Sequence, residues 1–272
     1  MVSSIIYDLK GYNHMNITQM TKIFREKLKT QAAGIFSKTS DPAFIEVMGY
    51  AGLDYVIIDL EHGPNTIQTA QNLIRAAQIA GIFPIVRVKE NCESIMGEAL
   101  DIGAGGLQIP QITNKSEAEA VIDRVKFHPD GHRGVCRFVR AADYSAKDRF
   151  EYFADANKSV VILQIEGKEG IENIDEILSV KGIDVIFVGP YDLSQSLGLT
   201  GQVKHPSVEE KMLEIVKKCA EKNITVGTFA DTPENAEKWR KNGVKYISYS
   251  VDVGIFYNAV SDLVKILKNQ EA

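Results

Sequence analysis

A chain of 272 residues can form one large α/β domain or two small ones. Its apolar content of 44% and charged content of 25% are typical of a globular protein with a substantial core. A formal charge of −5 argues against a general binder of nucleic acid or of an anionic membrane surface.

The first segment, Met1 to Met20, has neither a basic start nor an uninterrupted apolar stretch, so it does not resemble a signal peptide. No apolar run in the sequence is long enough to cross a bilayer. We therefore expect residues 1–23 to be an N-terminal extension and residues 24–272 to form a single domain without a membrane segment.

Short apolar or β-branched runs alternate with helical patterns from about residue 31 to the end. The predicted strands are Ala33–Ser37, Tyr55–Asp59, Pro84–Val88, Gly106–Pro110, Val160–Ile165, Val185–Gly189, Thr225–Thr228 and Tyr246–Ser250. The predicted helices between them are Asp41–Gly52, Thr66–Gly81, Glu93–Gly103, Lys115–Phe127, Gly170–Val180, Pro206–Asn223 and Thr232–Gly243. Eight such alternations without a linker predict a parallel (β/α)8 TIM barrel in the α/β class.

Two further segments have distinct patterns. The last predicted helix, from Gly254 to about Asn269, carries one apolar stripe that packs either on its own barrel or on a neighbouring subunit.

The connection from Phe127 to Lys158 is unusually long and contains Arg133, Arg137 and Arg140. These arginines indicate an anion-facing segment or a solvated surface.

The three cysteines, Cys92, Cys136 and Cys219, are far apart and form no C-x-x-C pair. They predict neither a disulfide framework nor a zinc site, and they favour a reducing, cytoplasmic location. We expect all three to be buried.

In a (β/α)8 barrel the active site lies at the carboxyl ends of the strands, and polar residues gather there in this sequence. Gln164 and Glu166 are two residues apart in the fifth strand, so their side chains share one face. The sixth strand ends at Gly-Pro and leads to Asp192. Two carboxylates on successive strands suit a hard divalent cation with open positions, whereas a lone Glu166 is more often a capping or ion-paired acid.

The second and third strands supply the remaining polar groups. Arg87 forms either a structural ion pair or a bidentate grip on a substrate carboxylate. Asp59 precedes His62 by three residues and can orient its imidazole, although a lone histidine usually has no chemical role. Glu61 contacts metal-bound water or caps the following helix. No lysine lies at a predicted strand end near these groups, which weakens a Schiff-base mechanism.

Six segments in consistent order resemble the HpcH/HpaI aldolase and citrate lyase family. They are I-I-D-L-E-H-G-P-N (57–65), I-V-R-V (85–88), D-I-G-A-G-G-L-Q-I-P-Q (101–111), G-H-R-G-V (131–135), L-Q-I-E (163–166) and F-V-G-P-Y-D-L-S-Q-S-L-G (187–198). Within that family the chain is most similar, over residues 24 to 268, to the 2-oxo-acid aldolases acting on 4-hydroxy-2-oxoheptanedioate and 2-dehydro-3-deoxyglucarate.

The resemblance implies a (β/α)8 homo-oligomer, a trimer or hexamer, that often exchanges its last helix between subunits. It implies a class II pyruvate aldolase that uses a divalent metal, Mg²⁺ or Mn²⁺, and cleaves a 4-hydroxy-2-oxo acid into pyruvate and an aldehyde through a metal-bound pyruvate enolate. The implied metal ligands are Glu166 and Asp192, with Arg87 as the carboxylate clamp. Its other implied site residues are His62 and Asp59 for acid–base work, and Gln164, Gly189, Pro190 and Tyr191 for binding.

The chemistry agrees with these residue types. Cleavage of the C3–C4 bond leaves an enolate that a Lewis acid stabilises, and a histidine is suited to remove the 4-hydroxyl proton. Two alternatives remain open: decarboxylation of an oxaloacetate-type acid at the same site, which does not need His62, and a non-catalytic carboxylate-binding barrel.

The segment after G-H-R-G-V departs from the family pattern, because Arg137 and Phe138 stand where smaller residues are more usual. We expect Arg137 to border the site and to favour an acceptor aldehyde that bears a carboxylate or phosphate.

Overall fold

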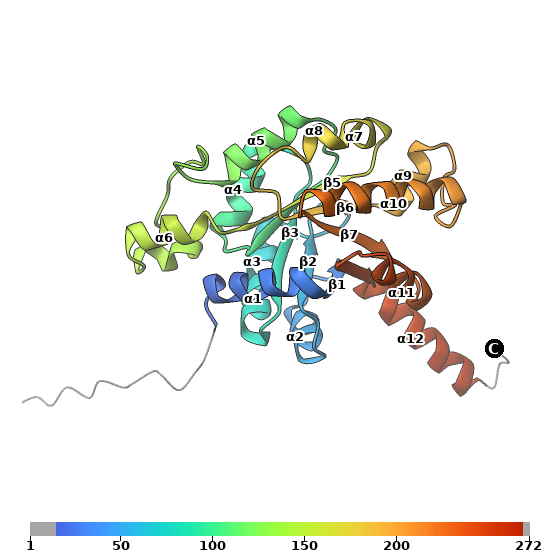
Figure 1. Cartoon of the computed structure of the whole chain (residues 1–272). Helices are drawn as coiled ribbons and strands as arrows, with labels where there is room; N and C mark the ends of the chain where they lie inside the picture. Colours follow the sequence, from blue (N-terminus) through green and yellow to red (C-terminus); the bar gives the residue numbers. More distant parts are fainter. Residues whose placement is uncertain (1–14, 269–272) are drawn as a thin grey trace, which may run out of the picture.

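The computed structural model describes residues 15–268, and in it eight parallel strands close into a barrel in chain order (Figure 1). Each strand pairs with the next along the chain, and the last pairs with the first. The predicted (β/α)8 barrel is therefore confirmed. The strands are β1 (Ala32–Ser37), β2 (Tyr55–Asp59), β3 (Phe83–Arg87), β4 (Gly106–Ile109), β5 (Val160–Ile165), β6 (Val185–Val188), β7 (Thr225–Ala230) and β8 (Tyr246–Val251).

Helices surround the barrel and follow the predicted alternation. They are α1 (Ile17–Thr30), α2 (Pro42–Tyr50), α3 (Ile67–Ala80), α4 (Glu93–Asp101), α5 (Lys115–Val125), the 3-10 helix η2 (Arg140–Ser145), α6 (Arg149–Ala156), α7 (Lys168–Glu172), α8 (Ile174–Ile177), α9 (Pro190–Ser196), α10 (Pro206–Glu221), α11 (Pro233–Lys241) and α12 (Asp252–Leu267). The single helix predicted over Gly170–Val180 is wrong, since α7 and α8 are separated at Asn173. No helix within residues 15–268 is both long enough and apolar enough to span a bilayer.

The strands are buried along most of their length, because side chains of the interior pack on one face and the surrounding helices pack on the other. Inside the barrel, Tyr55 and Tyr246 stack with ring centroids 4.2 Å apart. Gly34 makes room for this pair, since a Cβ there would lie 2.3 Å from the Tyr55 ring. The interior is therefore a packed core, and ligands can enter only from an end.

Helix α1 covers the end of the barrel where the strands begin. It starts with a capping box between Asn16 and Gln19, and it buries Met20, Phe24 and Leu28. The Phe24 ring stacks on that of Phe83 at 4.3 Å. The predicted boundary at residue 23 falls inside this helix, whereas residues 1–14 of the expected extension lie outside the described residues.

Helix α12 extends away from the barrel (Figure 1). Asp252 is the one buried residue of this helix. Its large apolar side chains are exposed, namely Val253, Ile255, Phe256, Tyr257, Val260, Leu263, Ile266 and Leu267. The apolar stripe does not cover its own barrel, and the predicted helix end at Asn269 lies outside the described residues.

Candidate active site

A cavity of about 410 Å³ opens at the carboxyl ends of the strands. Seven residues expected in the site line it: His62, Arg87, Gln164, Gly189, Pro190, Tyr191 and Asp192. The remaining lining residues are Phe36, Lys38, Phe187, Phe229, Asp231 and Val251. Since α1 closes the other end, this cavity is the open mouth of the barrel.

The carboxylate of Glu166, directly after β5, is held by two donors. The Gln164 amide Nε2 donates to Oε2 at 2.5 Å, and the backbone N–H of Gln111 donates to Oε1 at 3.0 Å. The side-chain amide of Gln108 in β4 donates in turn to the side-chain oxygen Oε1 of Gln164 at 2.7 Å, and this bond fixes the orientation of the Gln164 amide. Sequence reasoning missed Gln108, although its place in a short buried strand next to β5 was a usable signal.

Asp192 reaches the same place from the first turn of α9, and Gly189 lies between the two acids. A Cβ added to Gly189 would be 3.1 Å from an Asp192 carboxylate oxygen and 3.4 Å from a Glu166 carboxylate oxygen. The two carboxylates therefore converge over this glycine. The pKa of Glu166 is raised to about 7. Burial is the main cause and the nearby carboxylates of Asp192 and Glu61 add to it, whereas the hydrogen bonds from Gln164 and Gln111 oppose the rise.

Glu61 is the third carboxylate that influences this region. Its Oε2 is buried and has no hydrogen-bond partner among residues 15–268. Arg87 Nη1 lies 2.9 Å from this oxygen and forms an ion pair with it. Burial raises the pKa of Glu61, while Arg87 opposes that rise.

These oxygens fit a hard divalent cation such as Mg²⁺ or Mn²⁺. Within residues 15–268 no three His, Cys, Asp or Glu side chains are grouped closely enough to hold a metal. Glu166 and Asp192 could supply two oxygen ligands and leave the other positions to water or substrate, which is the usual arrangement for Mg²⁺.

Arg87, at the end of β3, makes a bidentate ion pair with Asp59. Its Nε donates to Asp59 Oδ1 at 2.9 Å and its Nη2 donates to Oδ2 at 2.8 Å. The guanidinium also lies 4.7 Å from the centre of the Phe36 ring. Although burial raises the pKa of Asp59, its bonds to Arg87 outweigh that effect and lower it. Arg87 thus forms the structural ion pair and also faces the cavity.

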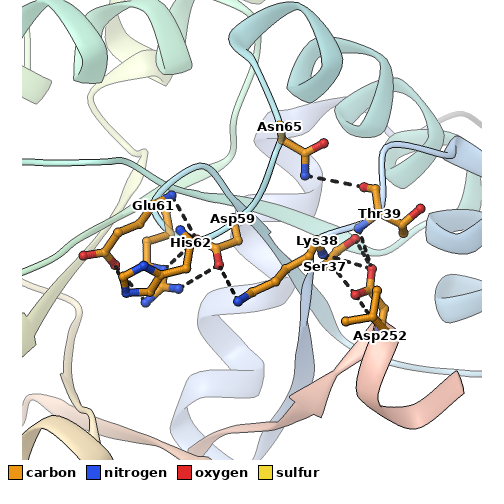
Figure 2. A network of polar contacts seen from close by, with 10 residues as sticks. Ser37, Lys38, Thr39, Asp59, Glu61, His62, Asn65 and Asp252 are labelled. Atoms are coloured by element: carbon orange, nitrogen blue, oxygen red, sulfur yellow. Dashed lines mark hydrogen bonds and ion pairs between the residues drawn. The ribbon is translucent and has the colours of Figure 1, made fainter. Parts of the chain in front are cut away.

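The expected pairing of Asp59 with the His62 imidazole is wrong. The Asp59 carboxylate accepts hydrogen bonds from Arg87 and from the backbone N–H groups of Glu61 and His62, at 3.1 and 3.3 Å (Figure 2). The His62 side chain is 66% exposed, and its Nε2 lies 3.9 Å from Glu61 Oε2. Asp59 is directed to Arg87 because the two residues are paired in register across β2 and β3.

A family model for the HpcH/HpaI aldolase/citrate lyase family matches residues 32–259. The chain belongs to this family. A 5-keto-4-deoxy-D-glucarate aldolase from Shigella boydii is 34% identical over 253 residues, which cover 90% of this chain and 98% of that protein. The predicted enzyme class, a carbon–carbon lyase, is confirmed.

Solved structures agree with this membership. An HpcH/HpaI aldolase/citrate lyase family protein from Burkholderia cenocepacia J2315 superposes with a TM-score of 0.86 at 30% identity, covering 90% of this chain and 99% of that one. The citrate synthase SbnG superposes with a TM-score of 0.83 at 30% identity, covering 93% and 99%.

Two acid or base side chains at the mouth of this family member were not expected from the sequence. Lys38 directly follows β1 and lines the cavity, so the expectation that no lysine lies near the site is wrong. Asp231, after β7, accepts a hydrogen bond from the Tyr191 hydroxyl at 2.7 Å. Lys38 and Asp231 both lie just beyond strands that were predicted from the sequence. Extending each predicted strand to its next polar residue would have identified both.

Arg137 does not line the cavity, contrary to expectation. The loop that contains Arg137 belongs to the connection from α5 to β5, which lies at the end of the barrel that α1 covers. A hydrogen bond from the Thr18 hydroxyl of α1 to Asp155 in the same connection, at 2.9 Å, agrees with this position. The Arg137 Nη2 donates to the backbone carbonyl of Ser145 at 3.0 Å. Within this chain, Arg137 therefore holds a turn and does not border the cavity.

The expectation that all cysteines are buried is also wrong. Cys219 is buried, but Cys92 is half-buried and Cys136 is exposed. The exposed Cys136 belongs to the same long connection as Arg137.

Proposed function

We propose that the protein is a metal-dependent aldolase that cleaves, or forms, a 4-hydroxy-2-oxo acid from pyruvate and an aldehyde. The observation that carries this proposal is the convergence of the Glu166 and Asp192 carboxylates over Gly189, beside a cavity-facing arginine. The 34% identical relative suggests 2-oxo acids derived from sugar diacids as the first substrates to try.

Each site residue has a role in this proposal. A bound Mg²⁺ or Mn²⁺ would supply a Lewis acid for the 2-oxo group. Gln164 holds the Glu166 carboxylate in place, and Arg87, itself held by Asp59, binds the substrate carboxylate through its remaining N–H groups. The exposed imidazole of His62 takes the proton from the 4-hydroxyl group. The main chain of Gly189 and Tyr191 borders the substrate, whereas Pro190 has no N–H to donate.

The proposal is tested by exchange of the pyruvate C3 protons into deuterated water, followed by NMR. Exchange should require a divalent cation and should stop when a chelator is added. Because Lys38 lies at the cavity, borohydride trapping in the presence of pyruvate is the parallel test for a Schiff base. Exchange that survives the chelator, or a trapped lysine adduct, would exclude the proposed mechanism.

Replacing His62 by Ala should separate cleavage from decarboxylation. Aldol cleavage should fall about 10²- to 10⁴-fold, since general acid–base catalysis contributes that much. Decarboxylation of oxaloacetate should be affected far less, because it does not deprotonate a hydroxyl group. Steady-state assays of both reactions on the same protein preparation measure this. An equal loss in both would remove His62 from the role of base.

Affinity for Mn²⁺ should depend on the protonation of Glu166. In the metal-free protein this carboxyl has a pKa of about 7, so below that pH a proton must leave before the cation binds. The apparent affinity should therefore fall by up to about tenfold for each pH unit below this pKa and level off above it. Calorimetric titration across this range measures the effect. A pH-independent affinity would show that Glu166 does not bind the cation.

We also propose that the protein is a homo-oligomer, a trimer or a hexamer, and that α12 packs on a neighbouring subunit. The exposed apolar side chains of α12 form a patch of the kind that marks subunit interfaces. The Phe256 ring lies near that of Phe44 on α2, with centroids 6.2 Å apart, so the patch continues onto a second helix. The widely spaced cysteines further support a cytoplasmic location.

Replacing both Phe256 and Leu263 on α12 by Asp should dissociate the oligomer. Two buried charges without partners are incompatible with an apolar interface. Sedimentation velocity should then show a smaller species that retains its helical content by circular dichroism. The control is Leu213→Asp, an exposed leucine on α10, which should leave the mass unchanged. An unchanged mass for the double variant would exclude α12 from the interface.

A further inference from the structure

Lys38 is a cation of the cavity whose side-chain donors are not used. Within residues 15–268 its ammonium group makes no hydrogen bond, and its ion-pair partner Asp59 lies 3.9 Å from it. The side chain is 29% exposed and lines the mouth of the barrel. An ammonium group with three available donors at a cavity is suited to bind an anionic oxygen of a ligand.

Arg87, which also carries a positive charge and lines the cavity, differs in this respect. Its Nε and Nη2 are committed to Asp59, and its Nη1 faces Glu61 at 2.9 Å. Of these two cations, Lys38 is the one without a structural duty. Removing its charge therefore need not expose a buried acid, because Asp59 keeps its bidentate partner.

The backbone that carries Lys38 is held by the start of α12. The buried carboxylate of Asp252 accepts a hydrogen bond from the Ser37 hydroxyl at 2.7 Å, from the Lys38 N–H at 3.0 Å and from the Thr39 N–H at 3.1 Å (Figure 2). One carboxylate thus joins three successive residues, the last of β1 and the two that follow it. On the other side, the Asn65 amide donates to the Thr39 carbonyl at 3.5 Å. The direction in which Lys38 leaves β1 is consequently set by residues far away in the sequence.

The position of Lys38 relative to the metal-ligand candidates indicates which part of a substrate it reaches. Glu166 and Asp192 follow β5 and β6, whereas Lys38 follows β1, across the closed barrel. A substrate whose 2-oxo group lies at the carboxylates would extend its other end toward β1. In that orientation the aldehyde half of the substrate would lie next to Lys38.

We propose that Lys38 binds an anionic group on the aldehyde half of the substrate and that Asp252 is the positioning residue that directs Lys38 there. This inference rests on the proposed aldolase function. It assigns to Lys38 the selection of an anionic aldehyde, a role that the sequence analysis had predicted for Arg137.

The test compares two acceptor aldehydes of equal chain length in aldol addition with pyruvate: succinic semialdehyde, which carries a carboxylate, and butanal, which is neutral. The ratio of their kcat/KM values should fall about tenfold to a hundredfold in Lys38→Met, as expected for a lost charge-assisted hydrogen bond. Lys38→Arg should restore most of the ratio. An unchanged ratio in Lys38→Met would overturn the inference. Proton exchange of pyruvate by the unsubstituted enzyme reports the proposed function separately, so the two failures are distinguishable.

The positioning role of Asp252 is tested by a double-mutant cycle. Asp252→Asn should lower the same ratio, and it should have no further effect in the Lys38→Met background. A merely structural role would reduce activity toward both aldehydes alike and would add to the effect of Lys38→Met. If Asp252→Asn does not fold, Ser37→Ala removes one bond of the same carboxylate and should shift the ratio in the same direction by a smaller factor. No shift with Ser37→Ala would then exclude the positioning role.

Discussion

Replacing Glu166 by Gln is expected to reduce pyruvate proton exchange and aldol cleavage by at least about a thousandfold, because a Lewis acid contributes several kcal/mol to stabilising an enolate. The carboxamide has the same shape but lacks the charge that a hard cation requires from this position. Asp192→Asn should have an effect of similar size, since its carboxylate converges on the same point.

The loss of activity should be accompanied by a loss of Mn²⁺ binding, whereas the protein should remain folded. Calorimetric titration with Mn²⁺ and thermal unfolding of the metal-free protein, performed beside the exchange assay, separate the two. Glu172→Gln is the matched control, because that acid is exposed on α7 and, within the described part of the chain, forms an ion pair only with Lys168. Retention of full exchange activity by Glu166→Gln would refute the assignment of this residue.

Replacing Arg87 by Met should lower both stability and substrate affinity. The change removes the guanidinium that contacts both Asp59, which is fully buried, and Glu61, which is nearly so, and it leaves Asp59 only the more distant Lys38 at 3.9 Å. Removing one partner of a buried ion pair costs about 3–5 kcal/mol of unfolding free energy. The KM for the 2-oxo acid should rise as well, since the cavity loses the proposed carboxylate clamp. Urea unfolding and steady-state kinetics measure the two effects.

A second substitution separates the structural effect from the binding effect. Adding Asp59→Asn to Arg87→Met removes the unpaired buried charge, so part of the lost stability should return while the KM stays high. Arg75→Met is the control, because the only hydrogen-bond partners of Arg75 in residues 15–268 are Asn72 and Gln71 on its own helix. This substitution should change stability by less than about 0.5 kcal/mol. Should the double variant recover its affinity for substrate, the arginine would have only a structural role.

The barrel could be predicted from the sequence because its strands are short apolar runs with helical patterns between them. A strand buried on both faces has to be apolar nearly throughout, as Val160–Ile165 and Val185–Val188 are. Helix α1 could not be assigned to the barrel in the same way. Its buried side chains contact the strand starts, and those contacts join residues distant in sequence.

The side-chain contact that could be predicted joins two residues that are close in sequence. Gln164 and Glu166 share a strand face, so their contact follows from spacing alone. The partner of Asp59 was mistaken, since proximity in sequence favoured His62 and the strand register favours Arg87. The register between neighbouring strands depends on tertiary contacts, so it could not be predicted from this sequence alone.

Contacts between distant segments account for what was missed. Lys38 is directed by Asp252 from the opposite end of the chain, and Gln108 acts on Gln164 from a neighbouring strand. The misplacement of Arg137 was avoidable. A connection that follows a barrel helix returns to the strand starts, away from the site. The predicted fold therefore already implied that Arg137 lies away from the cavity.

The most direct measurement of the central claim is a crystal structure grown with Mn²⁺ and pyruvate and recorded for the anomalous signal of manganese. The account predicts one anomalous peak with a carboxylate oxygen of Glu166 and one of Asp192 at about 2.1 Å, and pyruvate oxygens in the open positions. A peak elsewhere in the barrel, or pyruvate bound with these two side chains turned apart and nothing between them, would contradict it.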